Sequence, residues 1–196
     1  MTLFNELKEP YSAKDAQALA HIYSWGPIAF QVARLMIKYN IFELLHQTKE
    51  GLTRDQIVAQ TGLSDYAVKC LLDASLTMHS VLVNTETERY TLAKTGWFLL
   101  NDEMIRANID FNHDVNYEGW FMLDKALKEG YPAGLKHFGN WPTIYEGLSE
   151  LPQDVQKSWF GFDHYYSDHS FSEALQVIAD AGCRNLLDVG GNTGRF

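Results

Sequence analysis

The sequence predicts a mostly α-helical fold that leads into the first strand of an α/β domain. Apolar residues recur at helical spacing through most of residues 15–181 and then give way to the run N-L-L-D-V-G-G-N-T-G at residues 185–194. The apolar residues around Asp188 are typical of a buried strand, and the glycines suit a turn where the backbone approaches a ligand. In an open α/β sheet such a loop leads into a helix whose N-terminus favours polar or anionic groups.

The composition indicates a folded, soluble protein. Of the 196 residues, 46% are hydrophobic and 13% are aromatic, enough to form a core. No run approaches the roughly 18 to 20 apolar residues of a membrane span, and the N-terminus lacks a basic region followed by an apolar one. We therefore expect a cytoplasmic protein with no membrane partner. Cys70 and Cys183 show no disulfide or zinc spacing, so we expect two buried free thiols.

Two helices are expected at the N-terminus. Ser12 is a suitable cap for a first helix that covers residues 15–23, and Gly26-Pro27 should break it. Pro27 would then open a second helix at residues 28–46, because the first turn of a helix does not need its missing N–H. Asn40 marks an expected kink or break in that helix.

A compact series of capping and turn signals follows. Thr53 and Ser64 are positioned to cap two short helices that are joined by a turn at Gly62. Residues 81–83 and 89–92, separated by a polar stretch, predict a β-hairpin. Two helices, a glycine turn and a hairpin together predict a winged helix.

The charge of this module argues against its commonest use, which is DNA binding. Within residues 64–80 the only basic side chain apart from His79 is Lys69, and the net charge of the chain is −9. A major-groove reader needs Arg, Lys, Asn or Gln directed at bases and phosphates. We therefore interpret the module as a packing surface and expect no nucleic-acid partner. A winged-helix regulator with a ligand-sensing tail remains the alternative.

Residues 93–150 predict helices with aromatic turns and carry no chemistry by themselves. The apolar run at residues 95–100 is expected in the core, and residues 130–141 read as a loop before a short helix that opens at Pro142. Between residues 105 and 129 one helical face is expected to bury four side chains: Ile109, Trp120, Leu123 and Leu127.

The helix expected to start at Leu151-Pro152 has an aromatic face that suits an aromatic ligand with a polar edge. Phe162, Tyr166, His169 and Ser170 stand at i, i+4, i+7 and i+8, and a final amphipathic helix is expected at residues 171–181. The alternative is a core stripe whose histidine finds a backbone partner.

A metal site on the same helix is the weaker interpretation. His164 and Asp168 are an i, i+4 pair, but no third ligand stands on their face, so no metal is predicted.

The motifs together resemble a known family. F-D-H-Y-Y-S-D-H-S, E-A-L-Q-V-I and N-L-L-D-V-G-G-N-T-G are similar to segments of S-adenosylmethionine-dependent O-methyltransferases of the caffeate and hydroxyindole type, which act on hydroxylated aromatic small molecules. The resemblance implies a winged-helix dimerisation domain at residues 1–100 and a helical connector at 101–184 that lines the substrate site. Residues 185–196 would be the first strand and glycine loop of a truncated Rossmann-like domain.

The resemblance also implies roles for individual residues. The S-adenosylmethionine site would include Asp188, Gly190, Gly191, Gly194 and Ser170. The aromatic acceptor would face Phe162, Tyr166 and His169, with Tyr166 standing where relatives often have Met.

The catalytic groups of the family fall outside these residues. The general-base histidine and the ribose-binding acid would lie after residue 196, so no catalytic residue is assigned and the fragment is expected to be inactive. The apolar stripes of the N-terminal helices, too many for so small a module to bury, predict a homodimer through these helices and the winged helix. A non-catalytic member that keeps the fold and the dimer is a further alternative.

Overall fold

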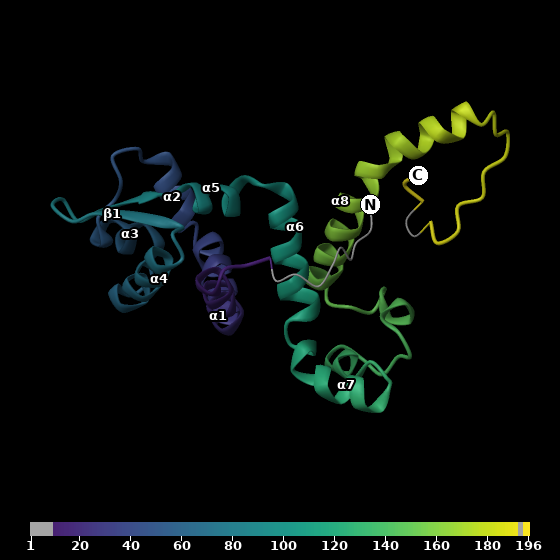
Figure 1. Cartoon of the computed structure of the whole chain (residues 1–196), viewed down its shortest axis with the longest axis horizontal. Coiled ribbons are helices and arrows are strands. Elements are labelled where there is room, and N and C mark those ends of the chain that lie inside the picture. Colours follow the sequence, from purple (N-terminus) through teal and green to yellow (C-terminus); the bar gives the residue numbers. More distant parts are fainter. Residues whose placement is uncertain (1–9, 192–193) are drawn as a thin grey trace. The chain divides into compact units, whose positions relative to one another are not determined.

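The computed structural model describes residues 10–191 and 194–196, and the chain forms two compact units, Met1–Asn101 and Asp102–Phe196 (Figure 1). Within the described ranges no helix combines the length and the apolar character that a membrane crossing needs. The described part of the first unit contains, in chain order, α1 (Ala13–Lys38), α2 (Ile41–Gln47), α3 (Arg54–Thr61), α4 (Asp65–Thr77), β1 (Val81–Asn84), β2 (Arg89–Leu92) and α5 (Lys94–Asn101).

The long helix α1 differs from the two helices expected at its position. Ser12 caps it as predicted, with its hydroxyl accepting from the Asp15 N–H at 3.2 Å, but the helix runs unbroken through Pro27. The break predicted at Gly26-Pro27 is therefore wrong. Pro27 is exposed, so its ring and missing N–H disturb only the local backbone. The helix ends instead before Asn40, which has a left-handed φ of 58°. The break expected at Asn40 is therefore confirmed.

The order of helix, turn, helix and hairpin follows the local signals. Thr53 forms a capping box with Gln56, and Ser64 caps α4 through the Ala67 N–H at 3.2 Å. Gly62 takes a φ of 70° at the turn between α3 and α4. Strands β1 and β2 pair antiparallel with Val81 opposite Leu92. Both caps, the glycine turn and the hairpin are confirmed.

The core of the first unit lies among α1, α2, α3, α4 and the hairpin. Its fully buried side chains include Met36, Phe42, Ile57 and Leu72. In α5 the expectation that this run is core holds only in part, because Leu99 and Leu100 pack against the core whereas Trp97 is 44% exposed and Phe98 is 50% exposed. The helix turns Gly96 toward the hairpin instead, where a β-carbon would overlap the Ser80 carbonyl.

The described part of the second unit is helical. Its elements are α6 (Glu103–Phe111), η1 (Asn112–Asn116, a π-helical turn), η2 (Gly119–Met122), α7 (Leu123–Glu129), η3 (Ala133–His137), η4 (Ile144–Gly147) and α8 (Gln153–Asp180). Helix α6 runs beside α8 (Figure 1), and a small core forms around Val115, Leu151 and Val155.

The apolar face predicted between residues 105 and 129 forms only in part. Ile109 is buried, but Trp120, Leu123 and Leu127 are more than half exposed. Segments η2 and η3 meet instead through their backbones, since a β-carbon on Gly134 would overlap the Gly119 carbonyl. The expected burial of the three larger side chains is therefore wrong.

Two further expectations at the C-terminal end are corrected. Helix α8 continues through Ser170 as one helix, so the separate final helix is wrong. The segment around Asp188 forms no strand, and Leu187 and Val189 are 84% and 87% exposed. A parallel strand needs a neighbour to satisfy its backbone groups, and the described residues of this unit offer none.

The two cysteines are free, as expected, but both are exposed rather than buried. Cys70 lies on the open side of α4, away from the buried Val68 and Leu72 of the same helix. Cys183 lies in the exposed segment that follows α8.

Candidate functional site

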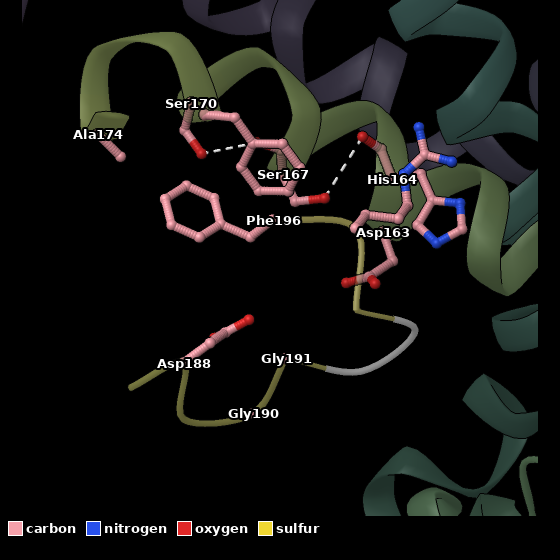
Figure 2. A pocket seen from close by; sticks show the side chains of 11 residues that line it. Asp163, His164, Ser167, Ser170, Ala174, Asp188, Gly190, Gly191 and Phe196 are labelled. Carbon is pink, nitrogen blue, oxygen red and sulfur yellow. Dashed lines mark hydrogen bonds between the residues drawn. The ribbon is translucent and has the colours of Figure 1, made fainter. Parts of the chain in front are cut away.

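A cavity of about 340 Å³ lies between α8 and the glycine-rich segment of the second unit (Figure 2). Four residues predicted to hold a cofactor line it together: Ser170 from α8, and Asp188, Gly190 and Gly191 from the segment. The fifth, Gly194, does not line the cavity, but its N–H donates to the Gly191 carbonyl at 2.6 Å. The fold thus brings Ser170 of α8 and three residues of the glycine-rich segment to the same cavity.

The glycines of this segment have conformations that larger residues adopt poorly. Gly190 and Gly194 have φ values of 82° and 70°, in the left-handed region where a β-carbon is strained. A β-carbon on Gly191 would overlap the Asp188 carboxylate and lie 2.9 Å from its Cγ. The Asp188 side chain therefore rests against the Gly191 backbone, which is only open enough because it is glycine.

The α8 wall of the cavity presents hydroxyl groups in a fixed orientation. The Ser170 hydroxyl donates to the Ser167 carbonyl at 2.7 Å, and the Ser167 hydroxyl donates to the His164 carbonyl at 3.4 Å (Figure 2). Because both protons are directed at the helix backbone, the oxygen lone pairs are available to accept hydrogen bonds from a ligand. This wall suits a ligand with N–H or O–H donors.

The three residues predicted to face an aromatic acceptor lie outside this cavity. Phe162 stacks on Phe111 of α6 with ring centroids 4.1 Å apart, and the Tyr166 hydroxyl donates to Asn108 Oδ1 at 3.1 Å. His169 Nδ1 lies 2.5 Å from the Tyr165 carbonyl. This contact agrees with the alternative interpretation, in which the histidine has a backbone partner. Their contact with an acceptor stays a prediction.

Asp163, Ser167 and Ala174 of α8 also line the cavity, and none of them was predicted from the sequence, unlike their neighbour Ser170. Asp163, Ser167, Ser170 and Ala174 stand at i, i+4, i+7 and i+11 on α8, so helical spacing alone could have identified this wall.

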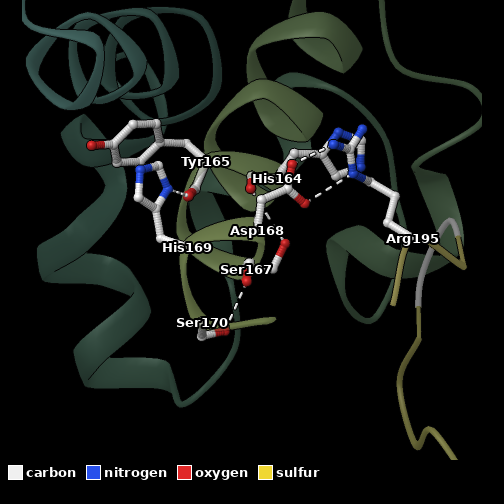
Figure 3. A network of polar contacts seen from close by, with 7 residues as sticks. All are labelled: His164, Tyr165, Ser167, Asp168, His169, Ser170 and Arg195. Carbon is white, nitrogen blue, oxygen red and sulfur yellow. Dashed lines mark hydrogen bonds and ion pairs between the residues drawn. The ribbon is translucent and has the colours of Figure 1, made fainter. Parts of the chain in front are cut away.

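Arg195, also a lining residue, makes a long-range contact with Asp168. Its Nε donates to Asp168 Oδ1 at 3.0 Å and its Nη2 donates to Oδ2 (Figure 3). This hydrogen bonding raises the pKa of the Arg195 guanidinium. No spacing rule could indicate a contact between residues so far apart.

Asp168, which the sequence analysis considered with His164 as a possible pair of metal ligands, is therefore hydrogen-bonded to the Arg195 guanidinium. Across the described ranges no three His, Cys, Asp or Glu side chains come together as metal ligands could.

Comparison with known proteins shows which proteins the chain is similar to. It is 30% identical over 181 residues to the L-tyrosine C(3)-methyltransferase of Streptomyces lavendulae, a match that covers 90% of this chain and 48% of that protein. Its fold is similar to that of the S-adenosylmethionine-dependent methyltransferase SibL, with a TM-score of 0.65 and 20% identity over 76% of this chain and 44% of that one. The mitomycin 7-O-methyltransferase MmcR gives a TM-score of 0.64 at 15% identity, over 85% and 48% of the two chains.

In the N-terminal unit, residues 17–90 match the Dimerisation2-like domain. The chain is thus similar to S-adenosylmethionine-dependent methyltransferases, as the motifs predicted, and it spans about half the length of the relatives it matches. The two solved structures, both below 25% identity, show only that the fold is similar. The names of the relatives give different methyl-accepting atoms: carbon in the tyrosine C(3)-methyltransferase and oxygen in the mitomycin 7-O-methyltransferase.

Proposed function

We propose that the chain is the N-terminal portion of an S-adenosylmethionine-dependent methyltransferase that acts on an aromatic small molecule. The observation that carries the proposal is the cavity in which Asp188, Gly190 and Gly191 face Ser170 of α8 (Figure 2). Its volume of about 340 Å³ falls at the lower end of the range of small-molecule sites. The close fit of Gly191 to Asp188 gives a bend without side-chain bulk, which suits a nucleoside-type ligand.

The residues of this chain would bind and orient rather than transfer protons. S-adenosylmethionine, when bound, supplies a methyl group on an electrophilic sulfonium. Asp188 would accept hydrogen bonds from the amino or hydroxyl groups of the cofactor, and Ser170 would accept one from the opposite wall. Holding the cofactor and acceptor in line contributes to the rate through proximity. The general base would be a histidine beyond residue 196, so the 196-residue chain alone would be inactive.

The acceptor would lie against Phe162, Tyr166 and His169 of α8, the first two of which contact α6. Tyr166 is 44% exposed, so a ligand could reach its ring and hydroxyl. We propose a hydroxyl oxygen as the accepting atom. The similarity to a tyrosine C-methyltransferase makes an aromatic carbon the competing outcome for the same site.

The first unit would be a winged-helix dimerisation domain at residues 1–100, joined to the catalytic part by a helical connector at 101–184. The match to the Dimerisation2-like domain supports a homodimer. So does the apolar surface of α1, where Ile22, Tyr23 and Trp25 are each more than 60% exposed.

Surface charge supports a role for the first unit other than DNA binding. The basic groups of the helix pair are engaged by acids, with Arg54 at 2.7 Å from Asp65 and Lys69 at 2.5 Å from Asp73. The net charge of −9 works against a nucleic-acid partner.

We further propose that the protein is cytoplasmic.

Labelled methyl transfer tests the proposal. The 196-residue chain and the complete product of its gene would each be mixed with methyl-labelled S-adenosylmethionine and a panel of hydroxylated aromatics that includes tyrosine. We expect transfer by the complete product only, and the NMR spectrum of the product would distinguish oxygen from carbon methylation. Transfer by the 196-residue chain would refute its inactivity, and a complete product that neither binds nor uses S-adenosylmethionine would refute the proposed function.

A further inference from the structure

Two consecutive residues after the glycine loop contact α8 at neighbouring positions. Arg195 makes two hydrogen bonds to the Asp168 carboxylate (Figure 3), and the Phe196 ring packs edge-on against Phe171 with centroids 5.0 Å apart. Asp168 and Phe171 are three residues apart on the helix, so they share one face. An ionic contact and an aromatic contact thus act at the same place.

Among its described residues, the segment that carries the glycine loop has few other contacts that hold it. Leu186, Leu187 and Val189 are 57%, 84% and 87% exposed, so their burial contributes little free energy. The ion pair joins residues 27 apart in sequence, and fixing such a loop opposes its conformational entropy. The position of Gly190 and Gly191 relative to α8 therefore depends on the contacts at Asp168 and Phe171.

The guanidinium of Arg195 is suited to this role. Two parallel N–H groups fix the orientation of a carboxylate as well as its distance, which a lysine ammonium does not do. The pair is partly solvated, with side-chain exposures of 47% for Arg195 and 35% for Asp168, so its strength is that of a surface ion pair.

We propose that Asp168 and Arg195 are positioning residues that hold the glycine loop against α8 and so set the width of the cavity between Gly190-Gly191 and Ser170. The pair touches no reacting atom and acts through the loop. Its effect on cofactor affinity rests on the proposed function, whereas its effect on the loop does not.

The first test measures the loop in the absence of ligand. Backbone order parameters of residues 186–191 would be determined by ¹⁵N relaxation NMR for the 196-residue chain, for Asp168→Asn and for the charge swap Asp168→Arg with Arg195→Asp. We expect ordered values for the wild type, values below about 0.6 for Asp168→Asn, and recovery in the swap. Lys128→Gln is the matched control, because it breaks another exposed ion pair of the same unit, to Asp124 at 2.8 Å.

The outcomes distinguish a specific effect of the Asp168–Arg195 ion pair from a general effect on α8. Equal order parameters in the wild type and Asp168→Asn would overturn the proposal, as would a swap that fails to restore order. Loss of order in the Lys128→Gln control would also overturn the proposal, because the effect would then not be specific to the Asp168–Arg195 ion pair. Thermal melting of each variant checks that α8 itself stays folded.

The second test measures ligand affinity, with S-adenosylhomocysteine as the probe. We expect Asp168→Asn to weaken binding by up to about fivefold, the range for an exposed ion pair, without a change in melting temperature. The swap should restore the affinity. A wild type that binds no S-adenosylhomocysteine, with the order parameters as expected, would refute the proposed function and leave the positioning role standing.

Discussion

Replacement of Gly191 by alanine isolates the contact between the glycine loop and the Asp188 carboxylate. The added β-carbon would overlap Asp188 Oδ2 and lie 2.9 Å from Cγ, closer than the roughly 3.4 to 4 Å of ordinary contact. The atoms in the way are the end of an exposed side chain, so the carboxylate rotates away by about an ångström while the backbone stays in place. The substitution should therefore move the carboxylate that is proposed to bind the ligand, without unfolding the unit.

The expected magnitudes follow from this geometry. The free energy of unfolding should change by less than about 0.5 kcal/mol, as for other exposed substitutions. A hydrogen bond from a ligand to a carboxylate contributes about 1.5 to 3 kcal/mol, so affinity for S-adenosylhomocysteine should fall about 10- to 150-fold. Ligand-observed NMR would follow the ratio of dissociation constants even where binding is weak.

The same substitution elsewhere in the unit gives the control. Gly161 lies in α8, and a β-carbon there would meet no atom within 4 Å. Gly161→Ala should leave ligand affinity unchanged and stabilise the helix by up to about 1 kcal/mol. Equal affinities for Gly191→Ala and the wild type would refute the reasoning, because Asp188 would then not contact the ligand.

Three further predictions concern other parts of the molecule. Phe42→Ala removes a fully buried ring from the first unit and should lower its free energy of unfolding by about 3 to 5 kcal/mol in urea, whereas a loss below 1 kcal/mol would contradict the core described above. Ile22→Asp on the exposed face of α1 should convert a homodimer to a monomer in light scattering at micromolar concentration with unchanged helix content, and a monomeric wild type would contradict the proposed dimer. The hydrogen bond from Thr143, at 2.5 Å, lowers the pKa of Glu146, so this carboxylate adds stability at neutral pH that is lost as the pH falls through the lowered pKa. Thr143→Val should raise that pKa toward its ordinary value in an NMR titration, and an unchanged pKa would exclude the hydroxyl as the cause.

Local capping and turn signals predicted much of the first unit. Thr53, Ser64 and Gly62 each act within three or four residues of themselves, and the structure has all three as expected. Pro27 shows the limit of such signals. A proline that is solvent-exposed disturbs a helix only locally, and the sequence does not reveal that exposure.

Expectations that depended on distant partners failed more often. The apolar run around Asp188 has a strand pattern, but a strand exists only where another strand satisfies its backbone. Trp97 and Leu127 are apolar and yet exposed, and beside Trp97 it is the Gly96 backbone that makes the close contact with the hairpin side. Periodicity indicates which residues share a face and not whether that face is covered.

The candidate site was predictable in outline. The glycine motif and Ser170 do meet at one cavity, which the order of elements in the resembled family implied. The pairing of Arg195 with Asp168 was not predictable, because it depends on how the C-terminal segment turns back toward α8. Phe162 and Tyr166 stand on one face as the spacing predicted, and that face contacts α6.

Residue-resolved titration with S-adenosylhomocysteine tests the central claim most directly. Amide resonances of the 196-residue chain would be followed up to millimolar ligand, so that weak binding is still detected. Ligand-induced shifts at Ser170, Asp188, Gly190 and Gly191, with none in α3 or α4, are the predicted result. Unchanged resonances at these four residues, or shifts confined to the first unit, would contradict the assignment of the cavity as the cofactor site.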